Sequence, residues 1–362
     1  MTGSVVLTGA SGFLGWHVRV LARALHLSDP TPVPRHVLTD ADRLAGLLSG
    51  ADRVLHVAGV NRGQPDIGNR ELADQLAAGL RRCATPPKVV VFANSTHSGS
   101  GTPYGQGKAA AAATLAEATR WSGSQFEDVL LPNLFGEHGR PHYNSVVATF
   151  CQLLAAGRAP QIDHDRPLDL LHATDAAALL LGVQVPGAGP VRRSVGEVRD
   201  QLRTIAFRYA TGEIPELTGR FDVRLFNTYR SHHFPANVPA QLVRHADPRG
   251  ELVEAVKVHG GGGQTFFSTT SPGVTRGQHF HLAKVERFVV LRGDAEIRIR
   301  RLMHSDVLSF RVSGDRPVFV DMPSMWAHSI TNVGHSELLT LFWANEVFDP
   351  LNPDTYPERV SS

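Results

Sequence analysis

The chain has 362 residues and a formal net charge of +2, with 42% hydrophobic and 19% charged residues. This length predicts two domains, and the scatter of Lys and Arg argues against nucleic acid or an anionic membrane surface as the main partner. The opening residues predict no signal peptide, and no stretch approaches the run of about 18 apolar residues that a membrane span needs. Cys83 and Cys151 lie in apolar, helix-like stretches, which indicates reduced thiols. We therefore expect a cytoplasmic globular protein without membrane insertion.

A glycine-rich turn follows directly after the first predicted strand. Residues 4–8 are a short apolar run, and helical periodicity continues beyond the turn to residue 25. Strand, glycine turn and helix in this order predict a dinucleotide-binding fingerprint, in which the backbone approaches the pyrophosphate closely. Glycine spacing alone is weak evidence in a chain with 34 glycines, so the strand and helix carry the prediction. The residues expected to contact the cofactor here are Gly9, Gly12, Phe13, Leu14 and Gly15.

The second predicted strand is short, lies around residues 32–36 and ends in Arg35. NAD-specific proteins place Asp or Glu at this point to bind the ribose 2′-hydroxyl, whereas Arg can pair with the 2′-phosphate of NADP. Arg35 therefore favours NADP over NAD, and the alternative is a solvated loop arginine.

Residues 51–58 predict a third strand, whose Val-rich character suits a parallel sheet that is buried on both faces. This strand leads into Ala58 and Gly59, which we expect to contact the cofactor. Asn61 and Arg62 follow and lie near the expected nicotinamide edge. They are candidates for binding a sugar, and the alternative is a polar loop.

A tyrosine and a lysine four residues apart open an Ala-rich helix. Tyr104 and Lys108 therefore lie on one helix face, where the lysine can lower the pKa of the phenol and hold the nicotinamide ribose. The phenol is then placed to exchange a proton with a carbonyl or alcohol oxygen. Ser95, which follows a predicted strand at residues 88–93, can donate a second hydrogen bond to that oxygen, and Thr96 is the alternative hydroxyl.

These motifs together resemble the short-chain dehydrogenase/reductase superfamily, in its nucleotide-sugar epimerase/reductase branch. The resemblance covers roughly residues 1–231 and includes the motifs TGASGFLG, LHVAGVN, YGQGK, LPNLFG and LLHATD. It implies that residues 132–167, with Asn133 among them, hold a nucleotide-sugar, and that the nicotinamide lies near Tyr104.

Histidines and a glutamate in the second half of the chain predict a metal site. His279 and His281 are two residues apart, so on a β-strand both imidazoles point to the same face. Glu286 follows closely, and His328 is a fourth candidate further along the chain. Imidazole and carboxylate together suit Zn, Fe, Ni or Mn. An HxH pair alone can arise by chance among 18 histidines, but the other two residues and the β-rich surroundings favour a metal.

The alternation of strand and helix is lost between residues 183 and 240, where a polar helix is predicted at residues 195–209. We place a domain boundary near Phe234, with an NADP-binding domain at residues 1–234 and a second domain at residues 235–362. Short β-branched and aromatic runs separated by turns predict a sandwich or barrel in the second domain. The expected strands are residues 252–257, 264–269, 286–291, 295–300, 307–312, 318–321, 329–332 and 338–343.

The spacing from Gly273 to Gly293 resembles the first motif of the cupin superfamily. Residues 323–332 resemble the second motif, with Met325 in place of its usual glycine. The resemblance implies a jelly-roll barrel with one inward-facing divalent metal, for which we favour zinc. The implied ligands are His279, His281, Glu286 and His328.

The two halves in this order resemble the CapF/WbjC family over essentially the full length. The resemblance implies an α/β Rossmann-type domain, an extended or atypical member of its superfamily, followed by an all-β cupin, in a homodimer. The implied substrate is a UDP-linked deoxy amino sugar, a UDP-2-acetamido-2,6-dideoxy-4-hexulose, on the route to UDP-N-acetyl-L-fucosamine and capsular polysaccharide. The cupin would invert C-3, and the reductase would then reduce the C-4 ketone with NADPH. A proton at C-3 is acidic only while C-4 is a ketone, so epimerisation must come first.

Three questions stay open at this point. The metal either acts as a Lewis acid on an enolate or, with a full tetrahedral shell, holds the barrel together. Lys284 is a candidate epimerase base or a surface lysine. The whole chain could instead reduce another nucleotide-sugar for natural-product glycosylation, or sense redox state with the cupin as a dimerisation module. The complete set of Ser95, Tyr104 and Lys108 argues against a sensor, which needs no proton donor.

Overall fold

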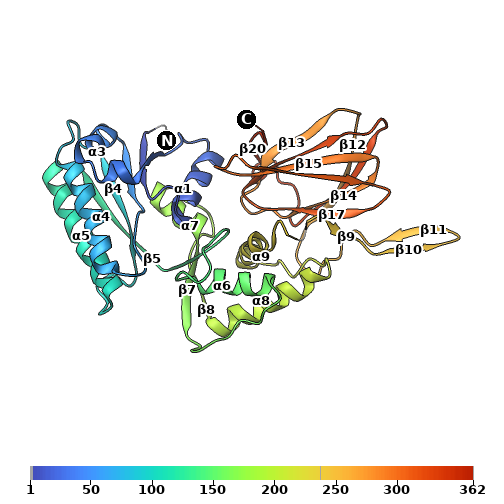
Figure 1. Ribbon diagram of the computed structural model, residues 1–362, viewed down its shortest axis with the longest axis horizontal. Coiled ribbons are helices and arrows are strands. Elements are labelled where there is room, and N and C mark those ends of the chain that lie inside the picture. The colour runs from blue at the N-terminus through green and yellow to red at the C-terminus, as the bar shows by residue number, and fades with distance from the viewer. Residues whose placement is uncertain (1–2, 237, 362) are drawn as a thin grey trace. The chain divides into compact units, whose positions relative to one another are not determined.

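The computed structural model describes residues 3–236 and 238–361, and the chain divides into two compact units (Figure 1). Unit 1 comprises Met1–Phe135, Gly139–Val146 and Arg166–Ser194. Unit 2 comprises Gly136–His138, Val147–Asp165 and Val195–Ser362.

Unit 1 is built on a five-stranded parallel sheet with the strand order β2-β1-β3-β4-β5. The strands are β1 (Val5–Thr8), β2 (Thr31–Val33), β3 (Arg53–His56), β4 (Val89–Ser95) and β5 (Gln125–Leu131). The Val-rich runs of β1, β3 and β4 are largely buried, because parallel strands are covered by helices on both faces. The predicted α/β fold of this half is confirmed.

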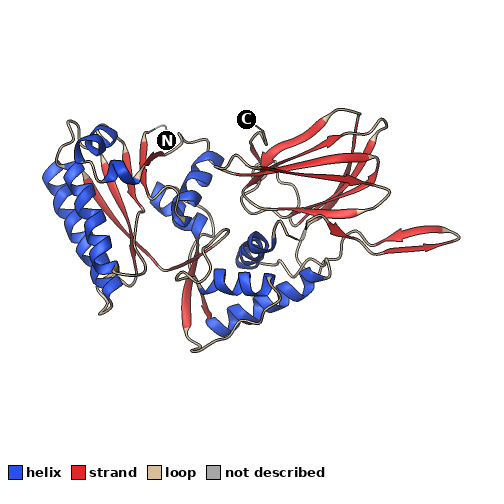
Figure 2. Ribbon diagram, in the orientation of Figure 1, coloured by secondary structure: helices blue, strands red, loops and turns tan. Residues whose placement is uncertain are grey.

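Helices lie on both sides of this sheet (Figure 2). Their bounds are α1 (Phe13–Ala24), α2 (Arg35–Leu38), α3 (Ala41–Leu48), α4 (Pro65–Leu80), α5 (Pro103–Ser122) and α7 (Ala173–Leu181). One apolar core joins α3, α4 and α5 to the sheet through residues such as Leu44, Leu76, Leu115 and Val54. Helix α1 packs against α7.

The end of β2 differs from the prediction. The strand stops at Val33, and Arg35 is instead the first residue of the short helix α2. Pro34 lies between them and caps the helix with a φ of −65°. Proline cannot donate to a strand ladder but suits a helix start, which explains the early end of the strand.

A small three-stranded sheet completes unit 1. Strand β6 (Asn133–Phe135) is parallel to β7 (Pro167–His172), and β8 (Val191–Ser194) is antiparallel to β7. The motif LLHATD covers the end of β7 and the start of α7, so its predicted position before a helix is confirmed.

Unit 2 contains two five-stranded antiparallel sheets, which confirms the β-rich prediction. The first sheet consists, in order, of β12 (Gln264–Thr270), β19 (Leu338–Ala344), β14 (Glu286–Arg292), β17 (Val318–Met322) and β9 (Ala240–Gln241). The second consists, in order, of β16 (Val307–Ser313), β15 (Asp294–Arg301), β18 (Trp326–Asn332), β13 (Thr275–Phe280) and β20 (Tyr356–Pro357). Apolar side chains of both sheets, including Phe288 and Phe342 from the first and Ile297 and Ile330 from the second, form one core.

A separate hairpin precedes these sheets. It consists of β10 (Arg244–Asp247) and β11 (Gly250–Val253), which pair only with each other among the described strands. The predicted strand at residues 252–257 is therefore wrong beyond Val253.

Three helices belong to unit 2, namely α6 (Val146–Ala155, from its second residue on), α8 (Val195–Ala210) and α9 (Arg220–His233). The predicted boundary near Phe234 places α8 and α9 with the first half, whereas the compact units place them with the β-sheets. The reason is polar packing: Tyr209 of α8 donates to Asp321 of β17 over 2.9 Å, and Arg230 of α9 donates to the carbonyl of Met322 over 2.9 Å. Among the described helices, none combines the length and the apolar character needed to cross a bilayer.

Candidate active site and metal centre

The glycine turn of unit 1 is packed so closely that side chains are excluded. Gly9 has a φ of +70°, and a Cβ on it would lie 2.7 Å from the backbone N of Ala58. A Cβ on Gly15 would lie 2.1 Å from the carbonyl oxygen of Gly9. Helix α1 begins at Phe13 without a side-chain cap from Gly12, so its first amides face out of the turn. Such a turn can accept a pyrophosphate on backbone amides.

Thr8, at the end of β1, ties this turn to the end of β3. Its hydroxyl accepts hydrogen bonds from the amides of Val57 and Ala58 over 3.2 Å each, and therefore donates to His56 Nδ1 at 2.9 Å. Burial lowers the pKa of His56 to about 3, and the charge of Lys108 acts in the same direction. His56 is thus neutral and, through Thr8, helps to hold the end of β3 beside the glycine turn. Neither residue was predicted from the sequence, because only the register of β1 against β3 brings them together.

Ser95, Tyr104 and Lys108 lie on two neighbouring elements. Ser95 is the last residue of β4 and is buried, whereas Thr96 is exposed. Tyr104 is in the first turn of α5, where Thr102 caps the helix by accepting from the amide of Gly105 over 3.1 Å. Burial raises the pKa of Tyr104, and a hydrogen bond with Ser95 opposes this rise. The structure thus brings the phenol and the Ser95 hydroxyl together.

Lys108 does not act on Tyr104 as predicted. Its ammonium donates to the carbonyl of Ala93 over 2.8 Å and lies 4.6 Å from the centre of the Phe92 ring. Burial lowers the pKa of Lys108 to about 8, although Asp128 opposes the shift. The prediction that Lys108 lowers the phenol pKa is therefore wrong for this structure, since the ammonium is directed at the backbone of β4. Gly59 lies beside it, because a Cβ there would be 3.7 Å from Nζ.

The candidate sugar-binding residues lie on other elements. Asn61 and Arg62 are exposed, and both contact Asn144: Arg62 Nε donates to its side-chain oxygen over 3.3 Å, and Asn144 donates to the Asn61 carbonyl over 2.9 Å. Asn133 is half-buried at the start of β6, and Arg35 is exposed at the start of α2. Asn144 lies within residues 132–167, the segment implied to hold the nucleotide-sugar, but no local pattern distinguishes it there, because the segment around it is irregular.

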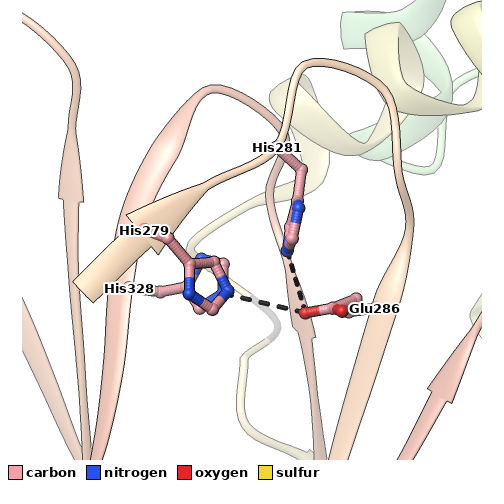
Figure 3. A group of neighbouring side chains, drawn as sticks. All are labelled: His279, His281, Glu286 and His328. Carbon is pink, nitrogen blue, oxygen red and sulfur yellow. Dashed lines mark hydrogen bonds and ion pairs between the residues drawn. The ribbon is translucent and has the colours of Figure 1, made fainter. Parts of the chain in front are cut away.

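The four predicted metal ligands converge in unit 2 (Figure 3). His279 lies in β13, His281 directly after this strand, Glu286 at the start of β14 and His328 in β18. One possible ligand atom from each residue lies within 4.8 Å of all the others. The rings of His279 and His328, on paired strands, lie edge to face with their centres 4.6 Å apart. This convergence, which the HxH spacing predicted, is confirmed.

The hydrogen bonds of two rings through Nδ1 direct their Nε2 atoms toward Glu286. His281 Nδ1 donates to the carbonyl of Asp354 over 2.5 Å, and His328 Nδ1 donates to the carbonyl of Trp326 over 3.3 Å. His281 Nε2 lies 2.9 Å and His328 Nε2 3.8 Å from the same oxygen of Glu286. The buried His328 Nε2 has no hydrogen-bond partner among the described residues. A bare buried nitrogen that is oriented by a backbone carbonyl is typical of a metal ligand.

The protonation states of the four candidate ligands suit the binding of a metal cation, except for that of His281. Burial lowers the pKa of His279 to about 4 and that of His328 well below its usual value. Burial would raise the pKa of Glu286, but His281 and the other histidines hold it at about 2. For His281, burial is outweighed by Glu286, which raises the pKa. Metal binding would therefore release a proton from His281.

The turn before His328 contains the one departure from the second cupin-like motif that the sequence showed. Met325, which replaces the glycine of the motif, has a φ of 63° and is completely buried. Its amide donates to the carbonyl of His281 over 2.7 Å. The turn thus keeps the left-handed backbone that glycine favours, although methionine adopts it at some cost.

Lys284 is buried, so its interpretation as a surface lysine is wrong. Only 5% of the residue is exposed, and its ammonium donates to the carbonyl of Pro353 and lies 3.6 Å from Glu346. Asp354, which no sequence pattern singled out, contacts the loop at residues 282–284 that carries this lysine. No spacing rule connects it to the histidines, because a separate segment carries it there.

The dinucleotide-type turn and the Ser–Tyr–Lys set of unit 1, together with the antiparallel sheets of unit 2, define a short-chain dehydrogenase/reductase that is fused to an antiparallel β-domain. Residues 245–356 match the family described as polysaccharide biosynthesis C-terminal domain. The chain is 31% identical to UDP-2-acetamido-2,6-beta-L-arabino-hexul-4-ose reductase of Pseudomonas aeruginosa, with 97% of each chain covered. The chain belongs to the family of this reductase, the CapF/WbjC family.

Solved structures agree with this family. The capsular polysaccharide assembling protein CapF of Staphylococcus aureus is 29% identical, with a TM-score of 0.60, and the alignment covers 98% of this chain and 99% of that one. CapF with the inhibitor 3-isopropenyl-tropolone is 28% identical, with a TM-score of 0.54 and the same coverage.

Proposed function

We propose that the chain is a bifunctional enzyme that epimerises C-3 and then reduces the C-4 ketone of a UDP-2-acetamido-2,6-dideoxy-4-hexulose. The observation that carries this proposal is the pairing of Tyr104 with Ser95 at the end of β4, in a chain 31% identical to a reductase of such a sugar along its length. The product would feed UDP-N-acetyl-L-fucosamine and capsular polysaccharide synthesis.

When bound, NADPH would supply the hydride for reduction at C-4. The residues proposed to hold this cofactor are Gly9, Gly12, Phe13, Leu14, Gly15, Arg35, Ala58, Gly59, Tyr104 and Lys108. Tyr104 donates its proton to the oxygen that becomes the C-4 hydroxyl, and its raised pKa keeps the phenol protonated at neutral pH. Ser95 orients the same oxygen by a hydrogen bond. Asn61, Arg62 and Asn133 are proposed to bind the sugar nucleotide.

We assign the C-3 inversion to unit 2, folded as a cupin. His279, His281, Glu286 and His328 would bind one divalent ion, for which zinc suits three imidazoles and a carboxylate. A bound ion supplies Lewis-acid stabilisation of an enolate oxygen, or it only stabilises the barrel. The proton at C-3 must leave while C-4 is still a ketone, so this step precedes the reduction.

Purified protein, NADPH and the UDP-4-hexulose test the proposal. We expect loss of nicotinamide absorbance and, by NMR, a product that is inverted at C-3 and reduced at C-4. Tyr104→Phe should lower the reduction rate at least about 100-fold, as expected for a lost general acid, while C-3 still takes up deuterium from D2O. Ser95→Ala should also slow reduction, and Thr96→Ala is its matched control.

Other outcomes decide between the alternatives. Oxidation of NADPH with a different 4-keto nucleotide-sugar, but not with this one, would assign the chain to another pathway. Tight NADPH binding without turnover of any such sugar would favour a redox sensor. If Tyr104→Phe also abolished deuterium uptake, the assignment of the two steps to separate sites would fail.

We further propose that the enzyme works as a homodimer in the cytoplasm. The strand β12 supports the dimer, because it pairs only with β19 among the described strands, carries no charged residue and exposes 70% of Phe267. Phe348, which is 58% exposed, lies beside its first residue, since its amide donates to the Gln264 side chain over 3.1 Å. Cys83 and Cys151 are free thiols, in keeping with a reducing compartment.

A further inference from the structure

The segment after β19, residues 345–361, runs back along the loop that carries the metal ligands. We call this segment the strap. Asn345 exchanges two hydrogen bonds with Val285, and β20 of the strap pairs with the end of β13, with Pro357 opposite His279. The amide of Glu358 then donates to the carbonyl of Gln278 over 2.9 Å. The strap therefore contacts the backbone on both sides of His279 and His281.

Asp354 is the residue of the strap that reaches the metal loop most directly. Its carboxylate accepts hydrogen bonds from three consecutive amides, those of Leu282, Ala283 and Lys284, over 2.9, 2.8 and 2.7 Å. Its own carbonyl accepts from Nδ1 of His281. Asp354 adopts a φ of 39°, a region that non-glycine residues enter only where the surroundings hold them. One residue thus fixes both a ligand ring and the loop that follows it.

The opposite side of the same loop is held by α9. Arg224 donates to the carbonyl of Leu282 over 3.0 Å, and Asn227 donates to the carbonyl of Ala283 over 2.6 Å. The amides of the loop therefore bond to Asp354 and its carbonyls to α9. At the far end of the strap, Arg300 donates to the side chain of Glu358 over 2.6 Å and to the carbonyl of Val360 over 2.8 Å. The loop is thus held on two sides, and the strap that carries Asp354 is itself held at its far end.

We propose that Asp354 is a positioning residue of the metal centre, which rests on the metal site proposed above. The carbonyl of Asp354 keeps the proton of His281 on Nδ1, so that Nε2 faces the other ligands. Its carboxylate fixes the loop so that the His281 ring keeps one orientation. Groups of this kind, which orient a ligand without touching the metal, typically contribute about 10- to 100-fold to metal affinity.

The test compares Asp354→Asn with Asp349→Asn. The amide of asparagine places a donor where the carboxylate accepted, so one loop amide loses its partner. Asp349 lies in the same strap, but its carboxylate accepts from Leu351 and Asn352 within its own turn. Each protein is stripped with a chelator and titrated with Co²⁺ and Zn²⁺ against a competing chelator, and the visible spectrum of bound Co²⁺ is recorded.

We expect Asp354→Asn to weaken binding of both ions by about 10- to 100-fold and to shift the visible bands of Co²⁺, with Asp349→Asn unchanged. A loss of stability alone would leave the spectrum of the bound ion as in the wild type. Should Asp354→Asn fail to fold, Arg300→Gln releases the far end of the strap, and we expect a smaller weakening of Co²⁺ affinity with the same spectral shift.

The outcomes separate this inference from the function. A wild-type protein that binds no stoichiometric Co²⁺ or Zn²⁺ overturns the metal site and this inference with it, while NADPH oxidation still tests the reductase. A wild-type protein that binds the ion, with the same affinity and spectrum in a folded Asp354→Asn or Arg300→Gln variant, overturns only the positioning role.

Discussion

Lys108 shows how a residue that spacing identifies can have contacts that spacing does not give. The interval from Tyr104 to Lys108 predicted a shared helix face, and α5 provides it. The partner of the ammonium, the carbonyl of Ala93, depends on how β4 lies against α5, which no local pattern encodes. For the same reason the sequence identified three histidines and Glu286 but could not assign the ring nitrogens, which depend on carbonyls of distant residues.

The pKa of Lys108 leads to a prediction for the reduction. Because burial lowers this pKa to about 8, the ammonium loses its charge as the pH rises through about 8, whereas Tyr104, whose pKa is raised, stays protonated. We expect kcat/KM for NADPH, which reports the free enzyme, to fall above pH 8 by up to about tenfold per pH unit. Stopped-flow or steady-state rates between pH 6 and about 10 measure this. The Lys108→Arg variant keeps its charge over this range, so its kcat/KM should be lower than that of the wild type but independent of pH. A wild-type kcat/KM that does not change with pH would contradict the proposed role of Lys108 in holding the cofactor.

At the scale of elements, the sequence predicted whether a segment is helix or strand better than it predicted where the segment ends. Val-rich runs identified β3 and β4, and the helix α8 was found almost to the residue, because long periodic patterns survive any tertiary packing. The predicted end of β2 was wrong, since Pro34 ends the strand and begins helix α2. The rule that residues two apart share a strand face gave the right pair of histidines, although β13 contains a bulge between Gly277 and His279, and His281 lies beyond its end. The bulge before His279 and the loop that contains His281, and not strand alternation alone, therefore bring the two histidines together.

The edge strand β12 gives a prediction about assembly. In a dimer formed through this edge, Phe267 would be buried, so Phe267→Lys should convert the dimer to a monomer, because a charge on an edge strand opposes pairing. Light scattering coupled to size-exclusion chromatography measures the mass. Phe207→Lys is the matched control, because Phe207 of α8 is 78% exposed in the same unit. A monomeric wild type, or a dimer that only Phe207→Lys disrupts, would refute this interface.

At the scale of the whole molecule, the two candidate sites lie in different compact units, Tyr104 in unit 1 and the cluster of three histidines and Glu286 in unit 2. Composition and motif order predicted these two halves and their fold classes. The assignment of α8 and α9 could not be predicted. It depends for α8 on the distant contact of Tyr209 with Asp321, and in α9 the buried Arg224 and Arg230 look like a solvated helix face in the sequence. Their partners are backbone carbonyls of the β-sheets and loops.

This separation predicts that the two activities can be lost independently. His328→Ala removes one of the four proposed ligands, which is buried. We therefore expect the protein to lose the proposed metal and the C-3 deuterium exchange, and to keep NADPH-dependent reduction of a substrate already inverted at C-3. Elemental analysis, NMR and absorbance measure the three properties. His335→Ala, at an exposed histidine that follows β18, is the control. Metal retained in His328→Ala would show that the ligand set is misread, and lost reduction would show that the sites are not independent.

Segments of the two units alternate along the chain, which has a consequence for how the gene can recombine. Unit 2 takes Gly136–His138 and Val147–Asp165 from within the stretch that builds unit 1, before the long C-terminal portion begins. A single cut in the gene cannot therefore deliver either unit whole: a fragment that starts at residue 235 would lack α6, α8 and α9, and with them the side chains that hold the loop at residues 282–284. Recombination that exchanged residues 1–234 or 235–362 alone would separate α9 from the loop that it holds. We therefore expect the two halves to be inherited together.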